Sequence, residues 1–100
     1  MIRANLMSGG SFTSEVLNIG FSAPSITLTK DYKAIIVFGS TSSATGSFDI
    51  TCGGVSATAT TQNQGTTDIG YAVIEDAKAG DTLTANWPST RAGYIIIGIN

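Results

Sequence analysis

The sequence predicts an all-β fold built from two packed sheets, and three observations lead to this prediction. The 100-residue chain consists of short runs rich in β-branched and aromatic residues, separated by turn-forming residues. Apolar residues do not recur at helical spacing, and the stretch 75–79 is long enough for one helical turn at most. Some runs alternate between apolar and polar residues, whereas others are apolar at consecutive positions. Alternating strands suit a sheet with one solvated face, and continuously apolar strands suit a sheet covered on both faces.

Eight strands are expected along the chain. Clusters of Gly, Ser, Thr, Asn and Pro set their boundaries, because these residues favour turns and interrupt regular structure. Two polar segments, 40–46 and 62–65, are expected to be outward-facing loops. The expected strands are 16–20, 25–29, 33–39, 47–52, 55–60, 68–75, 81–87 and 92–99.

The strands 47–52 and 55–60 are predicted to form a hairpin. They flank Gly53-Gly54, and both central positions of a tight two-residue turn favour positive φ, which glycine adopts freely. A two-residue loop also sets the register, which places polar residues on the opposite face from the apolar ones. The expected apolar pairs are Cys52 with Val55, Ile50 with Ala57, and Phe48 with Ala59.

The two classes of strand are expected to form separate sheets. Strands 25–29 and 81–87 alternate, and with the hairpin they would make a sheet that faces the core and solvent. Strands 33–39, 68–75 and 92–99 do not alternate, and with 16–20 they would make a sheet that faces the core and a partner. A second copy of the chain is the expected cover for that sheet.

This division is similar to that of the trimeric jelly roll of the C1q and tumour-necrosis-factor superfamily, in which one sheet packs around a three-fold axis. The end of the chain resembles C1q in two places: Gly80-Asp81 opens one strand, and Gly93-Tyr94 opens the last. The resemblance implies an eight-stranded antiparallel jelly-roll β-sandwich that forms a homotrimer.

Small jelly rolls rich in Ser, Thr and Gly also resemble bacteriophage virion proteins such as capsid decorations, head fibres and receptor-binding tips. This resemblance implies a non-enzymatic structural or adhesion protein that assembles in the host cytoplasm and resides in the virion. Residues 1–12 are expected to be a flexible lead-in that tethers one domain, 13–100, to a capsid or fibre protein. The stretch 1–7 is too short and too polar for a signal peptide.

The expected assembly surface comprises apolar residues of the continuously apolar strands. Burying them would drive association at about 25 cal/mol per Å² of apolar surface. Period two indicates which residues of a strand share a face, but not which face lies in the core. The predicted interface is therefore one set of residues or their opposite-face neighbours, and the set is Ile35, Val37, Tyr71, Val73, Ile95, Ile97 and Ile99.

Composition argues against several functions. The net charge is −2 and the basic residues are scattered, so nucleic-acid binding is not expected. No segment approaches the roughly 20 apolar residues of a membrane span. The chain has no histidine, which removes Ser-His-Asp catalysis, and its single cysteine, Cys52, is expected to be a small core residue. No catalytic residue, cofactor or metal is predicted.

A carbohydrate-binding module or lectin, with a cell-surface glycan as partner, is the alternative function. Trp87 and Tyr32 are its candidate ligand contacts, because aromatic rings stack on sugars and Trp87 lies next to a predicted loop. Carboxylates at Glu75, Asp76 and Asp81 flank one turn, where a solvated loop is a simpler interpretation than a glycosidase pair. Calcium binding lacks a loop of regularly spaced Asp, Asn and Gly.

Overall fold

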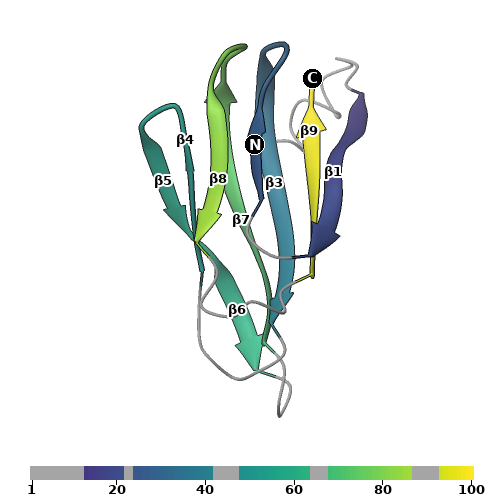
Figure 1. The fold of residues 1–100 in the computed structure, drawn as a ribbon, viewed down its shortest axis with the longest axis vertical. Coiled ribbons are helices and arrows are strands. Elements are labelled where there is room, and N and C mark those ends of the chain that lie inside the picture. Colours follow the sequence, from purple (N-terminus) through teal and green to yellow (C-terminus); the bar gives the residue numbers. More distant parts are fainter. Residues whose placement is uncertain (1–12, 22–23, 42–47, 64–67, 87–92) are drawn as a thin grey trace, which may run out of the picture.

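Two antiparallel sheets form a β-sandwich in the computed structural model, which describes residues 13–21, 24–41, 48–63, 68–86 and 93–100 (Figure 1). One sheet has five strands in the order β1-β9-β3-β7-β6, and the other has four in the order β2-β8-β4-β5. The prediction of an all-β fold with two sheets is confirmed. The strands are β1 (Ser14–Phe21), β2 (Ser25–Thr27), β3 (Tyr32–Thr41), β4 (Asp49–Cys52), β5 (Val55–Thr58), β6 (Thr60–Asn63), β7 (Asp68–Ala77), β8 (Thr82–Asn86) and β9 (Gly93–Ile99).

The described residues contain nine strands, where eight were expected. The expected grouping into two sheets is the one observed, but the predicted strand 55–60 divides at Ala59. Its first part, β5, pairs with β4, and the chain then crosses to the other sheet as β6, which pairs with β7. Ala59 is buried at the crossing and its N–H donates to the carbonyl of Phe48 at 2.8 Å. The polar residues of β6 suggested a loop, because they lack the apolar face expected of a strand. β6 lies at the edge of its sheet, and an edge strand does not need that face.

The β4–β5 hairpin has the predicted turn and register. Gly53 and Gly54 adopt φ angles of 59° and 85°, which glycine tolerates better than other residues. The pairs Ile50 with Ala57 and Cys52 with Val55 are those expected from the sequence.

The core lies between the inner faces of the two sheets. Its largest fully buried side chains are Ile35, Val37 and Ile96 from the five-stranded sheet and Ile50 and Leu83 from the four-stranded sheet. Cys52 is buried in the same cluster, as predicted, and burial raises the pKa of its thiol. The thiol is therefore a poor nucleophile and acts as a packing group.

Candidate functional site

The face of the five-stranded sheet that points away from the core is almost entirely apolar. Paired residues on neighbouring strands project to the same side, so the register defines four rows across β1, β9, β3 and β7. The fourth row is Ser14, Ile99, Ala34 and Glu75, which ends in an exposed carboxylate, and the other three rows contain no charged residue. We call the residues of the three uncharged rows the outer face. These three rows are Val16, Ile97, Ile36 and Val73; Ile19, Ile95, Phe38 and Tyr71; and Phe21, Gly93, Ser40 and Ile69.

Seven large apolar or aromatic side chains of the outer face are exposed, with exposed fractions between 36% and 82%. With about 200 Å² for each such side chain when fully exposed, the seven present on the order of 800 Å². The largest apolar patch of a typical monomer is roughly 300–600 Å². Elsewhere in the described residues the exposed large hydrophobics comprise only Val55, beside the hairpin turn. The exposed apolar surface is therefore concentrated on one face.

A β-bulge in β1 adds two residues to the outer face. The register shifts between Val16 and Asn18, so that Val16 pairs with Ile97 and Ile19 pairs with Ile95. Strict alternation would put Leu17, Ile19 and Phe21 together, but Leu17 packs on the core while Ile19 and Phe21 face outward. The Asn18 side chain accepts a hydrogen bond from the N–H of Ile19 at 2.8 Å. Sequence reasoning missed these β1 residues because period two does not anticipate a bulge.

The predicted interface residues divide between the two faces. Tyr71, Val73, Ile95 and Ile97 belong to the outer face. Ile35 and Val37 are fully buried in the core, so their opposite-face neighbours on β3 take their place outside. The reason is the register, since Ile36 pairs with Val73 and Ile97, and Phe38 pairs with Tyr71 and Ile95. Ile99 is only 7% exposed and lies outside the core cluster.

Tyr32, a candidate sugar contact, is a buried residue that is 5% exposed. Its hydroxyl donates to the carboxylate of Glu15, and the Lys30 ammonium lies 3.1 Å from that carboxylate and 5.6 Å from the centre of the Tyr32 ring. Burial, with a smaller contribution from Glu15, raises the pKa of Tyr32 to about 12. The ring joins β3 to β1 and offers no open stacking platform. Trp87, the other candidate contact, lies outside the described residues.

One of the candidate carboxylates, Asp81, holds the β7–β8 turn, together with Asp31 from the segment before β3. Asp81 accepts a hydrogen bond from the N–H of Lys78 at 3.1 Å, and Asp31 accepts one from the N–H of Ala79 at 2.9 Å. Within the described ranges, no three His, Cys, Asp or Glu side chains come together in a group that could hold a metal ion. The role of Asp81 is therefore structural.

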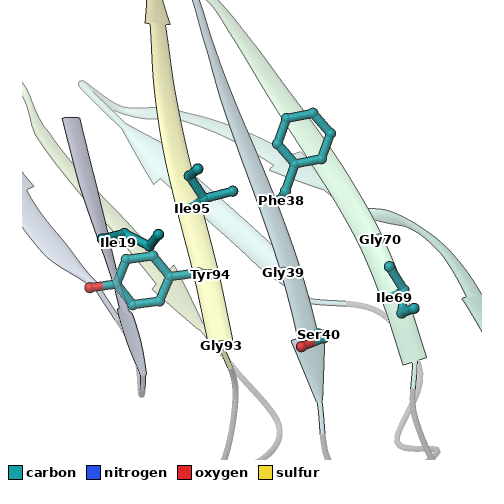
Figure 2. A pocket seen from close by; sticks show the side chains of 9 residues that line it. All are labelled: Ile19, Phe38, Gly39, Ser40, Ile69, Gly70, Gly93, Tyr94 and Ile95. Atoms are coloured by element: carbon teal, nitrogen blue, oxygen red, sulfur yellow. The ribbon is translucent and has the colours of Figure 1, made fainter. Parts of the chain in front are cut away.

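A hollow of about 340 Å³ interrupts the outer face where its third row carries small residues. Figure 2 shows Ile95 and Phe38 at one end of the hollow, Ile19 and Ile69 on opposite sides, and Gly93 and Ser40 at the other end. Gly39, Gly70 and Tyr94 complete its lining. None of the lining residues is charged, so the hollow suits an apolar group.

The described part of the chain contains no helix with the length and hydropathy needed to cross a membrane. Comparisons of the chain with protein-family models, with curated proteins and with solved structures found no match.

Proposed function

We propose that this chain is a non-enzymatic structural protein that assembles with copies of itself through the outer face. The observation that carries the proposal is the amount of apolar surface on this one face. On the order of 800 Å² is what each partner buries in a standard two-protein interface, and a trimer would divide this area between two neighbours of each copy. A face of this size and composition is costly to leave in water and would promote disordered aggregation unless a partner covered it.

Charge favours a second copy as that partner. The three rows of the outer face contain no charged side chain, and the adjoining row places one carboxylate, Glu75, at its β7 end. Two such faces can therefore meet over the three rows without an unpaired buried ion, with Glu75 at the solvated rim. β6 extends two of the rows with Thr60 and Gln62, which are also uncharged. A partner that used charge for recognition would find little to bind here.

The strand order supports a jelly-roll topology and a closed trimer. The arrangement β1-β9-β3-β7 beside β2-β8-β4-β5 divides the strands as the C1q and tumour-necrosis-factor trimeric jelly roll does, and β6 adds an edge strand to one sheet. In that jelly roll, the strands equivalent to β9, β3 and β7 pack around the three-fold axis. A closed ring would also bury an apolar face on every copy.

The proposal extends to a bacteriophage virion, as a capsid decoration or a fibre or receptor-binding tip. Its support is the content of Ser, Thr and Gly, together with a charged fraction of 12%. In this proposal residues 1–12 attach the domain to a capsid or fibre protein. Sugar binding has weaker support, because Tyr32 is buried.

The test is the mass of the particle in solution at micromolar concentration, measured by light scattering after size exclusion. The wild type should have three times the 10.2 kDa mass of the chain. Phe38→Lys places a charge on the outer face and should give a folded monomer, with folding checked by circular dichroism. Thr84→Lys places the same charge on the exposed face of the other sheet and should leave the trimer intact. A wild-type chain that stays monomeric would overturn the proposal.

A further inference from the structure

The outer face carries a protruding ring as well as a hollow. Phe21, the last residue of β1, is 82% exposed, which is the largest exposed fraction among the large hydrophobics that the structure describes. Its register partner is Gly93, which lines the hollow. A Cβ on Gly93 would lie 3.7 Å from the Cε1 atom of Phe21, so the ring stands beside the hollow with most of its surface in solvent.

The hollow exists because small residues interrupt a row of large ones. In the third row the small residues Gly93 of β9 and Ser40 of β3 lie between Phe21 and Ile69. In the neighbouring second row the same two strands carry the large residues Ile95 and Phe38. The resulting space of about 340 Å³ is near the lower end of the roughly 300–1,000 Å³ typical of ligand pockets. The hollow is shallow and open to solvent, and its apolar lining suits an apolar side chain from a neighbouring copy.

We propose that Phe21 of one copy inserts into the hollow of the next copy. This inference rests on the proposed self-association and names the contact that orients it. The ring belongs to edge strand β1, whereas the hollow is centred on β9, β3 and β7, so the two partners in the contact are different patches of the same face. In the proposed trimer this contact is heterologous, running from each copy to the next, and heterologous contacts close into rings when the rotation permits.

Substitutions on both sides of the contact test the insertion. Phe21→Ala removes the ring and Gly93→Leu fills the hollow; a Cβ at Gly93 meets no atom closer than 3.7 Å, so the backbone should accept the change. Each variant should weaken association at least about tenfold, the effect of losing one buried aromatic side chain. Val55→Ala, which truncates an exposed apolar residue of the other sheet, should leave the association constant unchanged.

The double variant separates a shared contact from two unrelated defects. Because Phe21 and Gly93 are neighbours within one chain, the hollow is filled here by Ser40→Leu, which lies two strands away from Phe21. If Phe21 occupies the hollow, Phe21→Ala combined with Ser40→Leu should associate about as weakly as either single variant, because each already removes the same contact. Additive losses would overturn the insertion. Wild-type association in both single variants would also overturn it while leaving self-association intact, whereas a monomeric wild type would overturn the proposed function itself.

Disulfide trapping tests the same contact without depending on how Gly93→Leu folds. Phe21→Cys and Ser40→Cys are combined in one chain, where β9 separates the two positions by two strand spacings, roughly 9–10 Å. Cα atoms more than about 7 Å apart do not form a disulfide without backbone movement, so bridges should form only between copies. Oxidation should give covalent dimers and trimers on a non-reducing gel. The matched pair Phe21→Cys with Val55→Cys should give none, and equal yields from the two pairs would contradict the insertion.

Discussion

The two outward faces of the sandwich differ in composition although the same alternation of strand residues builds both. The four-stranded sheet presents short polar side chains to solvent, and hydrogen bonds connect two of its cross-strand pairs: Thr58 donates to Asp49 at 2.8 Å, and the hydroxyls of Thr51 and Ser56 lie 3.2 Å apart. The five-stranded sheet presents Val, Ile, Phe and Tyr in the equivalent positions. An antiparallel sheet needs one apolar face to fold, so folding does not account for the second apolar face, and this is the face for which we propose a partner.

Two adjacent residues of β9 test this difference between the two faces most directly. Ile96 is fully buried in the core and Ile95 belongs to the outer face. Ile96→Asp should remove more than about 4 kcal/mol of stability, because it buries an unpaired carboxylate, and the chain should not fold. Ile95→Asp should leave a folded monomer. Circular dichroism melts and light scattering separate the two results. An Ile95→Asp variant that unfolded as Ile96→Asp does would show that the outer face serves folding.

Two glycines of the same strand provide a second test of the difference between the core side and the outer face. A Cβ at Gly98 would lie 2.5 Å from the ring of Tyr32, which is buried and held by its hydrogen bond to Glu15. Gly98→Ala should therefore lower the free energy of unfolding by about 2–3 kcal/mol, as overpacking does. Gly93→Ala meets only ordinary contacts and should change stability by less than about 0.5 kcal/mol. Urea unfolding of both variants checks the prediction, and equal effects would contradict it.

The sequence predicted the strands and their grouping better than it predicted the outer face. Turn residues and period two are local signals, so they located the Gly53-Gly54 hairpin with its register and separated the alternating strands from the apolar ones. The face of β3 that points outward depends on its pairing with β7 and β9, which no local pattern contains. The same holds for the β1 bulge that turns Ile19 outward, and for the change of sheets at Ala59.

The hairpin of the polar-faced sheet allows stability to be changed without touching the apolar face. Gly53 and Gly54 both have positive φ, but only at Gly53 would a Cβ meet another group, the Asp81 carboxylate at 2.5 Å. Gly54→Ala should lower the free energy of unfolding by about 1 kcal/mol through backbone strain alone, and Gly53→Ala by about 2 kcal/mol. Thermal unfolding measures the difference. Both variants should associate as the wild type does, because this turn lies outside the proposed interface.

The smallest expected effect comes from comparing an exposed tyrosine, Tyr71 on the outer face, with a buried one, Tyr32 beneath β1. Burial raises the pKa of Tyr32 from 10.0 to about 12, so the folded protein holds this proton more tightly than the unfolded chain. Its contribution to stability is complete below pH 10 and is lost as the pH rises towards 12. Tyr32→Phe should abolish that loss and lower Tm at neutral pH by a few degrees, because the hydrogen bond to Glu15 is gone.

The acid side of the same cluster has the opposite sign. The hydrogen bond from Tyr32, and then the one from Lys30, lowers the pKa of Glu15 below its ordinary value of 4.5. The folded protein therefore holds the Glu15 proton less tightly than the unfolded chain, and this contribution, present above pH 4.5, is lost as the pH falls through the lower folded-state pKa. Urea midpoints measured from acid pH to pH 12 should show both the acid and the alkaline loss of stability in the wild type and in Tyr71→Phe. In Tyr32→Phe the acid loss should be weaker and the alkaline loss due to Tyr32 should be absent. The contradicting result would be loss of the alkaline decrease in stability in Tyr71→Phe but not in Tyr32→Phe. In that case the buried Tyr32 hydroxyl would not be the group that connects β3 to β1, and so to one edge of the outer face.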